Sequence, residues 1–274
     1  MTTPTTRPNG VLEAGGILDR IVEAKAKRLE EVKRRVPLAR FAELRSRNTT
    51  SLAAALSRSD RVNIIAEIKQ RSPSKGIICE DFDPVRIAKS YANGGAAALS
   101  VLSEEDFFGG SLEHFEAIRS QVELPLLRKD FIFDEYQMYE SASAGADAVL
   151  LIVAILEDEL LAGLIRLAGK LGLEALVEVH SPDEMKRAAQ AGALIIGVNN
   201  RDLTTFKVDL ETSLHLVALT PKGVILVSES GIHTGSAIRR LKSAGFNGFL
   251  VGEHLMRASD PGDALRRLLE EAEA

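Results

Sequence analysis

Short apolar segments alternate with helical segments along most of the chain. Four times, a segment that ends in Ala-Gly or Asn-Gly leads into an apolar run, at residues 93–101, 144–151, 191–198 and 244–251. Glycine at this point is typical of a helix C-cap before a short turn into a strand. The repeat spans about 50 residues, twice one compact strand-helix unit, so each repeat should hold a second strand. Apolar runs fill those four positions: Val62–Lys69, Leu124–Lys129, Glu174–Glu178 and Gly223–Glu229.

Helical segments separate these eight strands. The expected helices are 84–93, 111–120, 134–144, 157–171, 181–191, 209–219, 234–244 and 259–272. Strict alternation of strand and helix predicts an α/β fold with a parallel sheet inside a layer of helices. Eight units favour a closed (β/α)8 barrel, the TIM barrel, which matches a chain of 274 residues. A doubly wound open sheet is the alternative, but no G-x-G-x-x-G motif follows the first strand.

The first sixty residues do not follow this alternation. Residues 1–10 are polar and rich in Thr and Pro, which predicts a disordered tail; residues 11–60 should form a helical extension, and 61–274 the barrel. Apolar residues recur at helical spacing from Ile17 until Pro37 stops the helix. Its other side interleaves Lys and Arg with Glu, which favours a solvated face with ion pairs over a basic binding patch. Thr50 should cap a second, short helix.

Composition and charge narrow the function classes. The net charge of -5 and the pI near 5.7 make nucleic acid and anionic membranes poor partners. The longest apolar run, Ala148–Leu156, is too short to span a bilayer, so it is interpreted as one doubly buried strand.

The N-terminus lacks a signal-peptide core, and the single cysteine, Cys79, fits a reducing cytoplasm. No Cys/His spacing suggests a metal site. Because no helix has an extra apolar face, we expect a monomer.

Charged residues gather at the ends of alternate strands. Strand carboxyl ends meet at one face of a barrel, where active sites are built. The residues expected to converge there are Glu67, Lys69, Lys129, Glu178 and Glu229. The structural alternative is a salt-bridge network that closes the barrel end. Burying two lysines and three glutamates without a function is costly, which favours a site.

Further candidates fall on the same face. Asn199 and Arg201 follow the sixth strand and could orient substrate oxygens, whereas their neighbours Asn200 and Asp202 suit a turn or a helix cap. Two loops with free backbone N–H groups predict a phosphate site after the last two strands. Their residues are Ser230, Gly231, Gly252 and Glu253.

The loops after the first three strands add two candidates. The loop at 71–76 contains Ser72 and suits either a mobile anion cover or an ordinary surface loop. Phe108 and Phe131 could form the wall for an aromatic ring, although one phenylalanine near this face should cap the core instead.

Taken in order, these motifs resemble indole-3-glycerol phosphate synthase of tryptophan biosynthesis, from about residue 12 to the end. The motifs are 65–69 (IAEIK), 71–74 (RSPS), 108–111 (FGGS), 127–131 (LRKDF), 150–153 (LLIV), 176–179 (LVEV), 197–203 (GVNNRDL), 228–232 (SESGI) and 250–252 (LVG). The extra N-terminal helices fit this family too. His254 is a departure, because relatives more often have a small residue there.

The resemblance implies a lyase that closes a ring in 1-(2-carboxyphenylamino)-1-deoxyribulose 5-phosphate and releases CO2 and water, with no cofactor. It implies Lys129 as the general acid, Lys69 as the carboxylate ligand, and Glu178 and Glu67 in later proton transfers. Asn199 would position hydroxyls. The implied substrate-binding residues are Ser72, Phe108, Phe131, Leu150, Arg201, Glu229, Ser230, Gly231, Val251, Gly252 and Glu253.

The pKa of Lys129 should reflect opposing neighbours: Lys69 and Arg128 would lower it, and Glu67 and Glu178 would raise it. Three other functions are compatible with a barrel of this kind. A phosphoribosylanthranilate isomerase-like enzyme would need a Cys/Asp acid–base pair, a Schiff-base aldolase would use Lys129 as nucleophile, and a sensor would bind a phosphate ligand without turnover.

Overall fold

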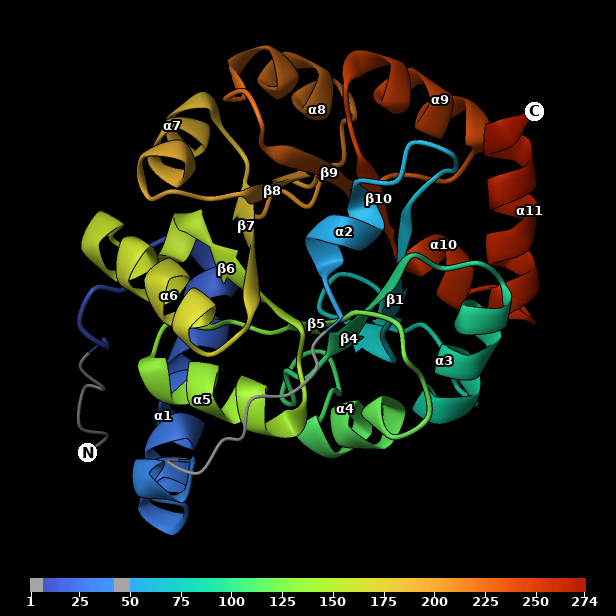
Figure 1. Ribbon diagram of the computed structural model, residues 1–274. Helices are drawn as coiled ribbons and strands as arrows, with labels where there is room; N and C mark the ends of the chain where they lie inside the picture. The colour runs from blue at the N-terminus through green and yellow to red at the C-terminus, as the bar shows by residue number, and fades with distance from the viewer. Residues whose placement is uncertain (1–6, 42–49) are drawn as a thin grey trace.

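Eight parallel strands close into a barrel in the computed structural model, which describes residues 7–41 and 50–274 (Figure 1). Each strand pairs with the next along the chain, and the last pairs with the first. The strands are β1 (Ile64–Ile68), β4 (Ala98–Leu102), β5 (Leu126–Lys129), β6 (Ala148–Ile152), β7 (Glu174–Val179), β8 (Ile195–Asn199), β9 (Ile225–Glu229) and β10 (Gly248–Val251). The predicted (β/α)8 barrel is thereby confirmed.

Helices surround the barrel at the predicted places. They are α3 (Pro84–Asn93), α4 (Leu112–Arg119), α5 (Glu135–Ala144), α6 (Asp158–Lys170), α7 (Pro182–Gln190), α8 (Glu211–Leu216), α9 (Gly235–Ala244) and α11 (Pro261–Glu273). Local sequence sets their ends. Asp134 forms a capping box with Gln137 at the start of α5, and Gly145 takes the left-handed conformation after its last residue.

Short elements complete the chain. They are a two-stranded hairpin of β2 (Arg71–Ser72) and β3 (Gly76–Ile77), the helix α10 (Glu253–Met256) and the 3-10 turns Leu38–Phe41, Val153–Ile155 and Val217–Leu219. The turn at Val153–Ile155 corrects one prediction. The run Ala148–Leu156 is not one strand, because the chain bends after Ile152 and forms a bridge between Leu156 and Val11. None of the helices in the described ranges has the length and apolar character that crossing a membrane requires.

The two N-terminal helices lie at opposite ends of the barrel. Helix α2 (Leu52–Leu56) lies over the middle of the strand ring in Figure 1 and contacts the amino ends of the strands: the amide of Ala53 donates to Glu174, where β7 begins. Helix α1 (Gly16–Arg35) reaches the carboxyl ends instead, and Lys25 contacts Asp130 there, directly after β5.

Three predictions for the N-terminal region differ from the structure. Ser51 caps α2 rather than Thr50, whose amide instead donates to Asp147. In the expected disordered tail, residues 1–6 lie outside the described residues, whereas the carbonyl of Gly10 accepts from the amide of Glu157. The charged side of α1 is not simply solvated, because Lys25 is 5% exposed and pairs with the barrel. Sequence spacing could not reveal these partners, since they belong to distant segments.

Candidate active site

A cavity opens at the carboxyl ends of the strands, and nearly all the predicted site residues line it. Those residues are Glu67, Lys69, Phe108, Lys129, Phe131, Leu150, Glu178, Asn199, Arg201, Glu229, Ser230, Gly231, Val251, Gly252 and Glu253. Ser72 does not line it, because its backbone pairs with Gly76 in the β2–β3 hairpin. Its role as a phosphate ligand stays a prediction.

Strand register places the charged side chains near the carboxyl ends of neighbouring strands. Glu178 of β7 lies opposite Gly197 of β8, and Asn199 lies opposite Glu229 of β9. Glycine is required at two positions next to the charged side chains, Gly197 and Gly252. A Cβ at Gly197 would overlap the carboxylate of Glu229, and a Cβ at Gly252 would overlap that of Glu67. Two glycines therefore make room for two buried carboxylates.

Lys129 and Glu178 form an ion pair inside the cavity, with 3.5 Å between Nζ and Oε2. Burial lowers the pKa of Lys129, but Glu178, Glu229 and Glu67 outweigh burial and raise it above its ordinary value. Burial raises the pKa of Glu178, but Lys129 outweighs this effect and holds it well below the usual range. At neutral pH the pair is therefore an ammonium next to a carboxylate. Arg128 is not among the main influences on the pKa of Lys129, and its guanidinium binds Asp130 and Glu140.

Two further side chains hold the Glu178 carboxylate. The amide Nδ2 of Asn199 donates to Oε1 over 3.2 Å, and Nε2 of His180 lies 3.4 Å from the same oxygen. Nδ1 of His180 lies 3.1 Å from Glu184. Burial lowers the pKa of His180, but these two glutamates raise it to about 10. Sequence analysis assigned no role to His180, although its position two residues after Glu178 places both on one side of the strand.

Glu67 and Lys69 form a second close pair on β1 and just after it. Burial raises the pKa of Glu67, but Lys69 and Lys129 outweigh it, so the net pKa lies below the ordinary value. Glu229 differs. Burial and the nearby Glu178 raise its pKa to about 8, so this carboxyl is protonated at neutral pH and can donate a hydrogen bond.

The loops after β9 and β10 form the polar end of the cavity. Ser230 has a positive φ of 66°, unusual for a residue with a side chain, and Gly231 follows at 81°. Helix α10 begins at Glu253, so its first backbone N–H groups lack intrahelical acceptors. Such amide groups suit an anion. Sequence analysis missed His233, whose ring centroid lies 5.7 Å from that of His254; both rings line the cavity.

Aromatic and aliphatic side chains form the opposite end. The rings of Phe108 and Phe131 have centroids 6.1 Å apart and are tilted by 35°. Leu18 of α1 lines the same cavity, so the N-terminal helix contributes to its wall. Sequence analysis also missed Leu18, because nothing local distinguishes it from a core residue. The cavity thus joins an apolar wall, an ammonium–carboxylate centre and a polar end with free backbone N–H groups.

Comparisons with known proteins point to one enzyme family. A family model described as indole-3-glycerol phosphate synthase matches residues 18–268. A protein of that name from Carboxydothermus hydrogenoformans is 48% identical over 264 residues, which cover 92% of this chain and 99% of the relative. Another from Lachnoclostridium phytofermentans is 46% identical over 270 residues, covering 92% of this chain and 98% of the relative.

Solved structures share the fold at low sequence identity. The 3-hexulose-6-phosphate synthase of Salmonella typhimurium is similar with a TM-score of 0.63 and 15% identity, over 77% of this chain and 99% of that one. The N-acetylmannosamine-6-phosphate 2-epimerase of Clostridium perfringens gives a TM-score of 0.61 and 14% identity, over 82% and 98%.

Proposed function

Because the chain belongs to the indole-3-glycerol phosphate synthase family, we propose that it converts 1-(2-carboxyphenylamino)-1-deoxyribulose 5-phosphate into indole-3-glycerol phosphate, CO2 and water. The observation that carries this proposal is the Lys129–Glu178 ion pair, which lies in one cavity with an aromatic wall and amide-rich loops. An aryl group suits the wall that Phe108 and Phe131 form in the cavity. A phosphate suits the backbone N–H groups around Ser230, Gly231, Gly252 and Glu253.

In the ring closure, the aryl carbon that carries the carboxylate bonds to the ribulose carbonyl carbon. Lys129 donates a proton to the carbonyl oxygen, which becomes a hydroxyl group. The raised pKa of Lys129 ensures that it is protonated when substrate arrives, and proton transfer from a positioned group contributes about 10²–10⁴-fold to the rate. Loss of CO2 then returns the bonding electrons to the ring, so no oxidant or reductant is needed.

The remaining charged groups suit the later steps. Lys69 would bind the anthranilate carboxylate until CO2 leaves and could supply the proton for dehydration. Glu178 would accept a proton as water is lost. In the free protein the ammonium of Lys129 holds the pKa of Glu178 low, so this step belongs to the substrate complex. Glu67 would bind a substrate hydroxyl, and Asn199 would orient the hydroxyls from beside Glu178. Arg201, 3.8 Å from Glu253, would act with the phosphate loops.

Two alternatives are less consistent with the site. A Schiff-base aldolase needs a neutral lysine nucleophile, whereas the pKa of Lys129 is raised. An isomerase with a Cys/Asp pair needs a thiol in the cavity, but Cys79 contacts the carbonyl of Asp81 outside it. We also propose a monomeric, cytoplasmic enzyme. The exposed large apolar side chains of the described ranges, Leu38, Ile77, Leu194 and Leu219, lie on separate elements.

The test is a fluorescence assay with the anthranilate-derived ribulose phosphate. The chain has no tryptophan, so a growing indole signal reports product alone. We expect turnover by the wild type, loss of ~10²–10⁴-fold in kcat for Lys129→Ala, and unchanged kcat for Lys170→Ala at the exposed end of α6. Near-normal kcat in Lys129→Ala would refute the general-acid role. A borohydride-trapped adduct at Lys129 would favour the aldolase, and binding without turnover would favour the sensor.

A further inference from the structure

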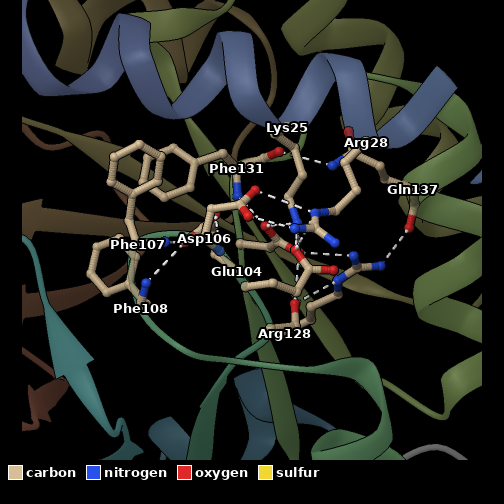
Figure 2. Close-up of polar contacts among 12 residues, drawn as sticks. Lys25, Arg28, Glu104, Asp106, Phe107, Phe108, Arg128, Phe131 and Gln137 are labelled. Carbon is tan, nitrogen blue, oxygen red and sulfur yellow. Dashed lines mark hydrogen bonds and ion pairs between the residues drawn. The ribbon is translucent and has the colours of Figure 1, made fainter. Parts of the chain in front are cut away.

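A cluster of buried charges lies beside the cavity and joins α1 to the carboxyl ends of β4 and β5 (Figure 2). Its centre is Lys25 of α1. Nζ lies 2.9 Å from Oδ1 of Asp130 and 2.9 Å from Oε2 of Glu105. Asp130 follows β5, and Glu105 lies in the loop after β4. One ammonium group therefore bridges two segments that are adjacent in the barrel.

Asp130 is held on every side. Its carboxylate also accepts from Oγ of Ser103 at 2.7 Å, from Nη2 of Arg128 at 2.8 Å and from the amide of Phe131 at 2.9 Å. Burial raises the pKa of Asp130, but Lys25 and Arg128 outweigh burial and lower it to about 2. The carboxylate thus stays ionised and keeps these partners at all ordinary pH values.

The cluster fixes the chain on both sides of Lys129. Arg128 and Asp130 are its neighbours in sequence. Asp130 lines the cavity together with Lys129, but its partners Lys25 and Arg128 do not. The guanidinium of Arg128 also bonds Oγ of Ser103 at 3.0 Å and Glu140 at 2.8 Å. The backbone at Lys129 is therefore clamped before and after the residue.

The other end of the bridge holds the aromatic loop. The Glu104 carboxylate accepts from the amides of Asp106, Phe107 and Phe108, at 3.0, 2.8 and 3.0 Å. Arg28, one turn after Lys25 on α1, binds the Asp106 carboxylate at 2.5 Å. In Figure 2 these groups lie beside the rings of Phe107, Phe108 and Phe131.

We propose that Lys25 is a positioning residue for the reaction. By bridging Glu105 and Asp130, it sets the direction in which Lys129 enters the cavity and the position of the aromatic wall that Phe108 and Phe131 form. Lys25 does not line that cavity, so its effect passes through these partners. The inference rests on the proposed function, since it takes Lys129 as the general acid.

The test compares two lysines of the same helix. Lys25→Met removes the bridge. Lys33→Met removes an ion pair of 2.6 Å between α1 and Asp134, which lies in the loop after β5 but away from the cavity. An error of about 1 Å in placing a catalytic group can lower a rate by about 10²-fold. We therefore expect Lys25→Met to lower kcat about 10–100-fold with a smaller rise in KM, and Lys33→Met to retain both.

A second readout separates positioning from loss of stability. If Lys129 is misplaced, proton transfer limits the rate, and the solvent deuterium isotope effect on kcat rises in Lys25→Met but not in Lys33→Met. Glu105→Gln, which keeps the Asp130 contact, should lower kcat only several-fold and serves if Lys25→Met does not fold.

The outcomes are decisive. Wild-type kcat and isotope effect in folded Lys25→Met would overturn the positioning role. If Lys25→Met does not fold, unchanged kcat in Glu105→Gln would overturn it. Lys129→Ala, measured in parallel, shows which of the two proposals has failed. Retained turnover in Lys129→Ala would count against the general-acid role of Lys129. Lost turnover in Lys129→Ala together with normal kinetics in Lys25→Met would count against the role of Lys25 alone.

Discussion

Glu229 should make the protein less stable in alkali, and replacing it with glutamine should remove this effect. The side chain is buried, and Oε1 has no hydrogen-bond partner among the described residues. Burial and Glu178 raise its pKa from an ordinary 4.5 to about 8. Folding therefore favours the protonated form. The contribution of this group to the free energy of unfolding is fully present below pH 4.5 and is lost as the pH rises through 8. The loss amounts to ~5 kcal/mol above pH 8, of which ~3 kcal/mol falls between pH 6 and pH 9.

The assay is thermal unfolding at pH 6 and pH 9. For a chain of this length, 1 kcal/mol shifts Tm by about 2–4 °C. The difference in Tm between Glu229→Gln and the wild type should therefore shift by about 6–12 °C in favour of the variant when the pH rises from 6 to 9. Glu31→Gln, on an exposed part of α1, should follow the wild type at both pH values. If the difference in Tm between Glu229→Gln and the wild type is the same at pH 6 and pH 9, Glu229 does not titrate in this range and the reasoning is refuted.

Two further predictions separate the site from the scaffold. Asn200 is buried, and its amide donates to Oγ of Ser228 and to the carbonyls of Glu229 and Ser230. Asn200→Ala should therefore lower the free energy of unfolding by ~2–3 kcal/mol. Because Ser230 belongs to the phosphate loop, the variant should also raise KM in steady-state kinetics. A Cβ at Gly262, where α11 meets α3, would overlap Ser90; Gly262→Ala should cost ~1–3 kcal/mol in thermal unfolding but leave kcat unchanged, and a changed kcat would contradict the separation.

The strand ends could be predicted because two simple rules apply there. Side chains alternate along a strand, and the carboxyl ends of parallel strands meet at one face. Glu67, Lys129, Glu178 and Glu229 therefore line one cavity, as their spacing indicated. His180 follows the same rule and could have been included.

The pKa of Lys129 shows a different kind of limit. The sequence places cations and carboxylates near it in nearly equal number, so the direction of the shift could not be predicted. In the structure the three carboxylates Glu178, Glu229 and Glu67 raise the pKa, whereas Arg128 faces other partners. The direction depends on which side of the strand each charge occupies and on distances of a few ångströms.

By itself, the sequence determined the repeated strand-helix pattern, the closed barrel and the face on which the charged residues gather, since periodicity and short turns are local properties. Only the tertiary structure decided that Lys25 is buried against Asp130 and Glu105, that Ser51 rather than Thr50 caps α2, and that the chain bends after Ile152. Each of these depends on contacts between segments distant in sequence, and such contacts override local preferences when they bury charge or complete hydrogen bonds.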